Sequence, residues 1–305
     1  MLWLVLLALQ AWPCLGAAAP RQVVLVLSDS SAPYQEAARA IREGLEGESA
    51  KLAIRIVVAG EAGADEAIAQ RESLLVPLGA KALQATAKSE QPIFAALVAR
   101  ATFEKIIPQP AANRRNSSVV YLDQPISRHL QLVRVAQPRA KTVGVVLGSA
   151  QSLSPSELTS AASSAGLRLS SVTLPSGDAL FSTLQTLLPT VDALLLFPDP
   201  LVVNRSSLQN LMLTTYRQRV PVVGYSQNLV DAGALVAVYS TPQQIGQQIA
   251  ENVQRMLLVR QWELPPPAYP KYFTIKTNNS VARSLDIDVP SDAVLAQRMG
   301  AGAGL

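Results

Sequence analysis

The chain has 305 residues, a net charge of +4, one cysteine and one histidine. The lone Cys14 excludes an internal disulfide, and the single His129 argues against a histidine metal site or a Ser-His-Asp triad. Aromatic residues make up only 5% of the chain and the basic residues are dispersed, so no nucleic-acid-binding surface is expected.

The first twenty residues, MLWLVLLALQAWPCLGAAAP, contain no charged side chain and pass from an apolar core to small residues. This pattern is typical of a secretory signal peptide, predicted over residues 1–18 with cleavage between Gly16 and Ala18. A short membrane anchor and a misassigned start site are the alternatives. A lipoprotein anchor at Cys14 fits poorly, because Trp-Pro precedes the cysteine. We expect a soluble, monomeric mature protein, exported to the periplasm.

The first half of the mature chain alternates β-branched apolar runs with segments of helical period. This βαβαβαβ order predicts a parallel sheet covered by helices on both faces. Strands are predicted in RQVVLVLSDS (21–30), KLAIRIVVAG (51–60), SLLVPLGA (73–80) and QPIFAALVA (91–99), and helices in PYQEAARAIREGLEG (33–47), ADEAIAQR (64–71) and AKALQATAKS (80–89).

The segment AANRRNSSVVYLDQP (111–125) interrupts this rhythm and predicts a crossing out of the first domain near residue 123. A second alternating run follows. A helix is expected with Ile126, Leu130 and Val133 on one face, followed by helices at 155–166, 178–189, 201–219 and 241–261, and strands at 141–149, 167–174, 191–197, 220–226 and 233–240. The last of these helices opens with a capping box at Thr241 and Gln244. A proline linker, LPPPAYP (264–270), then leads to a final strand and helix in KYFTIKTNNSVARSLDI (271–287).

Two similar βα sets of this kind predict two doubly wound parallel-sheet domains of Rossmann-like type. The expected boundaries are 21–122 plus 240–268 for the first domain, and 124–238 plus 270–305 for the second. If this division is right, the strands around residues 23–27 and 143–147 belong to different sheets.

Several blocks with this content and spacing resemble a known family. They are PRAKTVGVVLGS, VDALLLFPDPLVVN, VPVVGYSQNLVDAGALVAVYSTPQQIGQQIAENVQRML and FTIKTNNSVARSLDIDVP, with SLLVPLGAKAL and QPIFAALVA in the first half. The chain is similar to ABC transporter substrate-binding proteins with the periplasmic-binding-protein type I fold, in the branch associated with aromatic amino acids. The resemblance implies two lobes joined by a three-segment hinge, a small solute bound between them, and ABC permease and ATPase subunits as partners. One departure is LVARATF, where the branch typically has Gly-Asp-Pro and this chain has Arg100.

Ligands of open parallel sheets bind at the carboxyl ends of the strands, so the loops that follow each predicted strand supply the candidate ligand-binding residues. These residues are Ser28, Ser30, Ser31, Tyr34, Gly79, Ala80, Leu97, Arg100, Ser149, Gln151, Ser152, Asp199, Tyr225, Ser226 and Gln227. Ser30 and Ser31 precede a helix, where they suit either an anionic group of the ligand or ordinary capping of the helix. Tyr34 and Tyr225 are candidate walls.

Asp199 lies between two prolines directly after the strand LLLF, which the prolines bring to a stop. Two roles are open for its carboxylate: accepting hydrogen bonds from a ligand amine or hydroxyl, and capping the helix that follows. The two roles are compatible with one another.

Enzymatic activity is not expected. GYSQN (224–228) has Asn228 where a nucleophile elbow requires glycine, and His129 precedes Ser226 instead of following it. We expect His129 to lie on a helix away from the binding loops and to have a structural role. Neither a metal nor a cofactor is expected. Two functions fit the sequence: a periplasmic solute-binding protein that delivers a small polar ligand, an amino acid being one candidate, to an ABC transporter, and a sensor or accessory binding subunit of the same fold.

Overall fold

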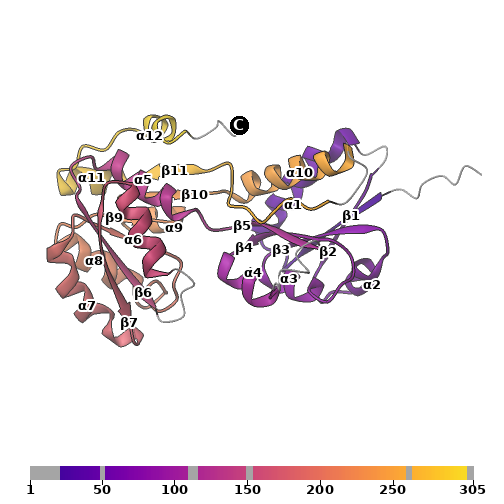
Figure 1. The fold of residues 1–305 in the computed structure, drawn as a ribbon, viewed down its shortest axis with the longest axis horizontal. Helices are drawn as coiled ribbons and strands as arrows, with labels where there is room; N and C mark the ends of the chain where they lie inside the picture. The colour runs from indigo at the N-terminus through magenta and orange to yellow at the C-terminus, as the bar shows by residue number, and fades with distance from the viewer. Residues whose placement is uncertain (1–20, 49–51, 109–115, 149–153, 259–262, 301–305) are drawn as a thin grey trace, which may run out of the picture.

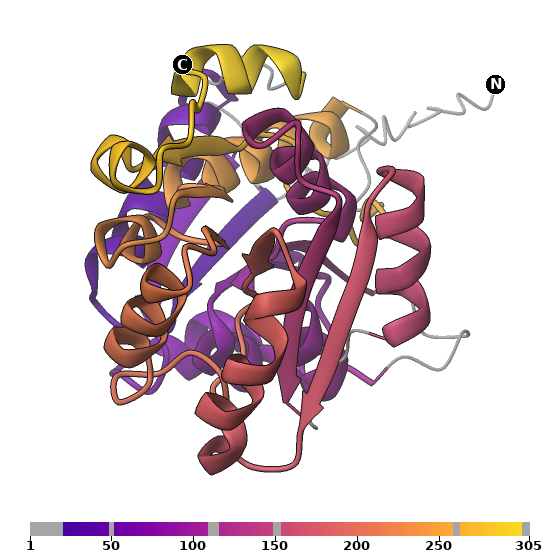
Figure 2. The same ribbon diagram turned by 90° about the vertical axis from the view of Figure 1, so that its left-hand side faces the viewer.

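The computed structural model describes residues 21–48, 52–108, 116–148, 154–258 and 263–300. Its strands form two sheets, and the views in Figures 1 and 2 show a lobe built around each. The strands at residues 23–27 and 143–147 lie in different sheets, as the sequence predicted.

The first sheet is entirely parallel and has the order β2-β1-β3-β4-β5. Its central strands β3 and β4 are buried along their whole length, which explains their continuous apolar sequences. The strands are β1 (Arg21–Leu27), β2 (Leu52–Val58), β3 (Ser73–Leu78), β4 (Ile93–Val98) and β5 (Ser117–Tyr121), and the helices between them are α1 (Ala32–Leu45), α2 (Ala64–Ala69), α3 (Ala80–Thr86) and α4 (Arg100–Ile106).

The second sheet has the order β11-β10-β9-β8-β6-β7, and β11 is antiparallel to β10. Its strands are β6 (Thr142–Gly148), β7 (Arg168–Leu174), β8 (Ala193–Leu195), β9 (Val222–Gly224), β10 (Val236–Tyr239) and β11 (Thr274–Thr277). The α-helices of this lobe are α5 (Ile126–Ala136), α6 (Pro155–Ser164), α7 (Leu180–Leu187), α8 (Leu208–Arg217), α9 (Gln227–Asp231), α11 (Asn279–Leu285) and α12 (Asp292–Arg298).

Between the described elements the chain passes three times from one lobe to the other. The first crossing joins β5 to α5, the second joins β10 to α10 (Pro242–Leu258), and the third returns from α10 to β11. Helix α10 belongs to the first lobe because Ile245, Ile249 and Val253 share a core cluster with residues of α1 and β1. Figure 1 shows α10 beside α1.

Helix α10 begins with the predicted capping box, in which Gln244 N–H donates to Thr241 Oγ1 and Thr241 N–H donates to Gln244 Oε1. Three other local features differ from, or were not included in, the sequence prediction. The helix expected from residue 201 begins only at Leu208, because the Asn204 side chain accepts from the backbone of Ser206 and Ser207 and holds a turn there. Residues 117–121, in the segment that interrupts the predicted alternation, form a fifth strand of the first sheet, inside the predicted first-domain boundary at residue 122. Helix α4 follows β4 directly, where no helix was expected.

Candidate functional site

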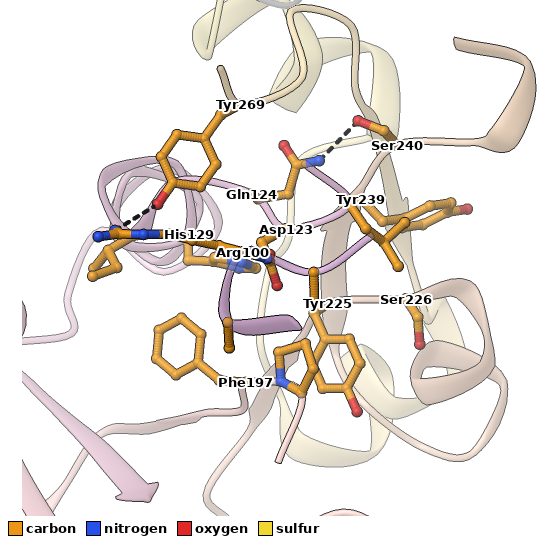
Figure 3. A pocket seen from close by; sticks show the side chains of 15 residues that line it. Arg100, Asp123, Gln124, His129, Phe197, Tyr225, Ser226, Tyr239, Ser240 and Tyr269 are labelled. Atoms are coloured by element: carbon orange, nitrogen blue, oxygen red, sulfur yellow. Dashed lines mark hydrogen bonds between the residues drawn. The ribbon is translucent and has the colours of Figure 1, made fainter. Parts of the chain in front are cut away.

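A pocket of about 300 Å³ lies where the two lobes and the crossings meet (Figure 3). Concave sites lined by apolar groups with a few polar ones are the usual places for small ligands. The lining residues are Ala99, Arg100, Ala101, Leu122, Asp123, Gln124, Ile126, His129, Phe197, Pro198, Tyr225, Ser226, Tyr239, Ser240 and Tyr269.

The two formal charges of the lining come from the first lobe and the first crossing. Arg100 opens α4 at the carboxyl end of β4, and its guanidinium donates from Nε to Glu104 Oε1 at 2.9 Å and from Nη1 to Tyr269 Oη at 3.2 Å. The hydrogen bond to Glu104, followed by that to Tyr269, raises the pKa of Arg100, which therefore stays a cation.

Asp123 supplies the negative charge of the pocket. Its Oδ2 accepts a hydrogen bond from the backbone N–H of Arg100, so the carboxylate is joined to the start of α4. Burial raises the pKa of Asp123 above its ordinary value, while the backbone hydrogen bond from Arg100 lowers it. Arg100 and Asp123 are therefore joined through the backbone N–H of Arg100, while the Arg100 guanidinium is bonded to Glu104 and Tyr269.

The second lobe faces these charges with aromatic rings. Phe197 follows β8, Tyr225 follows β9 and Tyr239 ends β10, so each lies at the carboxyl end of a strand. Figure 3 shows Phe197 and Tyr225 on the side of the pocket opposite Tyr269. Burial, with a smaller contribution from the charge of Asp199, raises the pKa of Tyr225. These rings offer apolar contact area, and Tyr225 also offers a hydroxyl group.

His129 does not lie away from the binding loops, contrary to the expectation from the sequence. The first turn of α5 directs it into the pocket lining, where its ring packs edge-on against Phe197 with 5.4 Å between ring centroids. Only 2% of the residue is exposed, and burial lowers its pKa to about 3, with a further contribution from Arg128. The imidazole is therefore neutral at physiological pH, and its Nδ1 has no hydrogen-bond partner among the described residues.

A hydrogen-bond network ties the three crossings together beside the pocket. Gln124 of the first crossing donates from Nε2 to Ser240 Oγ of the second, and Ser240 Oγ donates to the backbone oxygen of Tyr272. Arg128 donates to Gln124 Oε1 and to the backbone oxygen of Pro270, and its guanidinium lies 4.3 Å from the centroid of the Phe273 ring. Each of the three crossing segments is therefore hydrogen-bonded to another crossing segment beside the pocket.

Of the residues predicted from the strand ends, the lining includes Arg100, Tyr225 and Ser226. Gln227 lies one residue further on and accepts a hydrogen bond from the Tyr239 hydroxyl group at 2.6 Å. Ser149, Gln151 and Ser152 lie outside the described residues. Ligand contact by any of these residues stays a prediction.

The loops of the first three strands lie outside the pocket lining. Ser28 is buried, and its Oγ accepts from the N–H of Ala82 at 3.0 Å, which is a structural contact. Gly79 has φ of +93° and packs so closely on Tyr34 and Ser28 that a Cβ would lie 2.5 Å from Ser28 Oγ. Ala80 begins α3, and Ser30 and Ser31 are exposed.

Asp199 and Leu97 are both buried and do not belong to the pocket lining. Asp199 is 5% exposed, and its carboxylate accepts from the N–H groups of Gly148 and Leu201. It therefore binds the end of β6 to the turn that follows β8, instead of capping α8. Leu97 is 9% exposed and lies within the core of the first lobe.

The sequence did not single out the lining residues of the crossings, although it predicted that crossings exist. Among them are Leu122, Asp123, Gln124, Ser240 and Tyr269. The predicted crossings could have identified them. Three segments that connect two lobes must run along the bottom of the cleft between the lobes, so polar residues in these segments are candidate ligand-binding residues.

The comparisons with known proteins agree with this architecture. The family profile of the ABC transporter substrate binding protein matches residues 55–299, which is most of the chain. The chain belongs to this family. The resemblance stated from the sequence is thereby confirmed at the level of the family, whose members bind small ligands for ABC transporters. No curated protein sequence matched the chain.

Solved structures of substrate-binding proteins share the fold at low sequence identity. A ligand-free, open substrate binding protein with adhesive properties from Clostridium difficile is 17% identical, with a TM-score of 0.73, 89% of this chain and 97% of that chain covered. An ABC domain in complex with L-Trp from Streptococcus pneumonia is 18% identical, with a TM-score of 0.59 and coverages of 90% and 98%. A periplasmic ribose ABC transporter protein from Conexibacter woesei is 14% identical, with a TM-score of 0.56 and coverages of 89% and 96%.

Two further findings concern the described residues alone. None of their helices has the length and apolar character required to cross a bilayer. They also contain no group of three or more His, Cys, Asp and Glu side chains placed to hold a metal ion. The predicted signal peptide falls outside the described residues.

Proposed function

We propose that this substrate-binding protein captures a small amphipathic molecule in the pocket between its lobes and delivers it to an ABC permease. The observation that carries the proposal is the division of the lining: Arg100 and Asp123 place opposite charges on one side, and Phe197 and Tyr225 place rings on the other. A ligand that carries both charges at one end and an apolar body at the other matches this division.

An amino acid with a large apolar side chain has this chemistry. Arg100 suits its carboxylate, Asp123 suits its ammonium group, and the rings of the second lobe suit its side chain. The L-Trp complex of the Streptococcus pneumonia protein supports the same ligand class, and makes L-tryptophan the first probe. Sugars are a poorer match, because Gln124 and Ser240 are bonded to each other and leave few free hydroxyl partners.

Calorimetric titration with L-tryptophan, tryptamine and indole-3-propionate tests this proposal. The second probe lacks the carboxylate and the third lacks the ammonium group, so each is expected to bind at least tenfold more weakly than L-tryptophan. Arg100→Gln and Asp123→Asn should each weaken L-tryptophan binding about ten- to a hundredfold, since a hydrogen bond to a charged group contributes ~1.5–3 kcal/mol.

Lys276→Gln is the matched control, because Lys276 forms an exposed ion pair with Asp292 outside the lining. Its affinity for L-tryptophan should equal that of the parent. If none of the three probes binds, native mass spectrometry of protein purified from the periplasm identifies the retained ligand. A retained molecule with no ionic group would contradict the proposal.

Capture between lobes requires that the lobes move about the crossings. We take the boundaries as 21–122 plus 240–268 and 124–238 plus 270–305, and the three crossings as the hinge. Supporting this division, α10 packs in the first lobe and β11 pairs with β10 in the second. Export by the signal peptide and delivery to a permease complete the proposal, and ligand uptake by cells lacking the gene tests the delivery step. Retained uptake would favour a sensor or accessory subunit.

A further inference from the structure

Leu97 has a backbone conformation that its position in β4 does not ordinarily allow. Its φ is +56°, in the left-handed region. Among the described residues, the other non-glycine positions with positive φ are Glu72, Arg219 and Asp286, all polar. A bulky apolar side chain in this conformation is strained, and such strain persists where the surroundings enforce it, commonly at functional sites.

The pairing of β4 with β5 shows what the conformation does. Ala96 pairs with Val120 and Val98 pairs with Tyr121, so Leu97 is an extra residue, a β-bulge. The side chains agree with this register. Phe94, Ala96 and Leu97 pack in the core cluster that contains α10, whereas Ala95 and Val98 pack in the cluster on the other side of the sheet.

The bulge reverses the face of Val98, the last residue of β4. A regular strand would alternate, and would put Val98 in the cluster that Leu97 enters. It would also pair Leu97 with Tyr121, which would bring Ala99 to the level of Asp123. In the actual register Val98 is at the level of Tyr121, and its carbonyl accepts from the N–H of Leu122 at 3.0 Å.

The residue brought to the level of Asp123 is therefore Arg100. Its backbone N–H donates to Asp123 Oδ2, and its guanidinium reaches Tyr269 Oη at 3.2 Å (Figure 3). One extra residue in β4 thus decides whether the residue whose N–H meets the Asp123 carboxylate carries the guanidinium of Arg100 or the methyl group of Ala99.

We propose that Leu97 is a positioning residue for ligand recognition: its bulge sets the Arg100–Asp123 pair that receives the two charges of the ligand. The inference rests on the proposed function for the ligand, but the placement of the pair is testable without any ligand. Leu97 itself does not belong to the pocket lining.

Two substitutions of similar volume separate the bulge from simple packing. Leu97→Met, like the parent leucine, has no branch at Cβ and is expected to keep the bulge. Leu97→Ile places a β-branched side chain at positive φ, which is sterically disfavoured, so the strand is expected to move toward regular pairing. Leu97→Gly is the second test of the backbone, because glycine adopts positive φ freely while losing the packing.

The readout is the amide signal of Arg100 in ¹⁵N-arginine-labelled protein, followed against pH by NMR. Because this N–H donates to Asp123, its shift should follow the ionisation of that carboxyl group, and Asp123→Asn should abolish the response. The titratable groups that face Asp123 are Arg100 and Glu104 of α4 and Tyr121 of β5. We expect the parent, Leu97→Met and Leu97→Gly to show the response and Leu97→Ile to lose it.

Calorimetry with L-tryptophan gives the second readout, an affinity at least tenfold lower for Leu97→Ile than for Leu97→Met. A folded Leu97→Ile variant that keeps the Arg100 response would overturn the inference. If Leu97→Ile does not fold, Leu97→Gly decides: a retained response supports the bulge, and a lost response shows that packing alone matters and overturns it. Failure of the parent to bind L-tryptophan contradicts only the proposed ligand class, because the NMR result stands by itself.

Discussion

Gln124 and Ser240 lie 116 residues apart in the sequence, and a buried hydrogen bond of 2.8 Å joins them. Ser240 Oγ also donates to the backbone oxygen of Tyr272, so one hydroxyl group connects all three crossings. The lobes are proposed to move about these crossings. During such a movement, this hydrogen bond would hold the three crossing segments together at Ser240. Bending is then confined to the residues on either side of it.

Ser240→Ala should lower the free energy of unfolding by ~1–3 kcal/mol, because Gln124 Nε2 and the Tyr272 carbonyl group would both lose a buried partner. Urea unfolding followed by circular dichroism measures the change. Gln254→Ala is the matched control, since it removes an exposed hydrogen bond to the backbone of Gly44 and should change stability by less than about 0.5 kcal/mol. If both substitutions change the free energy of unfolding equally, the buried bond between the crossings stabilises the fold no more than an exposed hydrogen bond does.

His129 should make stability depend on pH in the acid range. Its ordinary pKa is about 6.5, and burial lowers the pKa in the folded protein to about 3. Above pH 6.5 both states are neutral at this residue. Between pH 6.5 and 3 the unfolded chain takes up a proton that the folded chain does not, so the free energy of unfolding should fall by roughly 1.4 kcal/mol per pH unit.

His129→Phe removes the titrating group while keeping a ring against Phe197. Urea midpoints measured from pH 7 to pH 4 should fall less steeply for this variant than for the parent, and the difference between the two slopes isolates His129 from the carboxylates. Parallel slopes would mean that the imidazole is protonated in the folded protein.

Most of the fold was predictable from the sequence, because the strands of a doubly wound sheet are continuous apolar runs and the helices between them have a clear period. The prediction was wrong after β8, where the helical period of residues 201–207 is overridden by the Asn204 side chain bonding to the local backbone. Periodicity reports which face is apolar, but it does not report such local competition.

The pocket was only partly predictable. The carboxyl ends of strands led to Arg100, Tyr225 and Ser226, since these follow single strands. Asp123 and Tyr269 could not be placed in the same way, because they meet only when segments separated by almost half the chain come together. The bulge at Leu97 is also absent from the pattern, as one extra residue in a uniformly apolar strand leaves no mark in the sequence.

Gly246 allows α10 to lie directly on α1. A Cβ atom at this position would be 2.6 Å from the backbone oxygen of Ala37 and 2.9 Å from the Cβ of Ala40, closer than normal contact. Gly246→Ala should therefore lower the free energy of unfolding by ~1–3 kcal/mol, although alanine is the better helix former. Gly47→Ala, where a Cβ would meet nothing within 4 Å, is the control and should be neutral or slightly stabilising. Urea unfolding of both variants measures the change. If Gly246→Ala leaves the free energy of unfolding unchanged, α1 and α10 can move apart without loss of stability.

Asp199 shows how binding and structural roles can be separated. Its carboxylate accepts from the N–H groups of Gly148 and Leu201, and it lies close enough to raise the pKa of Tyr225. Asp199→Ala should remove both bonds and lower the free energy of unfolding by ~1.5–3 kcal/mol, since the acceptor is charged. Asp199→Asn keeps one acceptor oxygen but turns an amide donor toward one of the two N–H groups, so it should lose about as much stability.

Measurements of ligand affinity show whether Asp199 contacts the ligand or only holds β6 against the turn after β8. If the carboxylate only holds the end of β6 against the turn after β8, a folded Asp199→Asn protein should bind L-tryptophan within about threefold of the parent, whereas Tyr225→Ala, which removes a lining ring, should bind it at least tenfold more weakly. Calorimetry at a temperature where both variants are folded measures the affinities. If Asp199→Asn instead keeps the parent's stability and loses tenfold or more in affinity, the carboxylate contacts the ligand directly, because losing a ligand contact need not destabilise the unliganded fold.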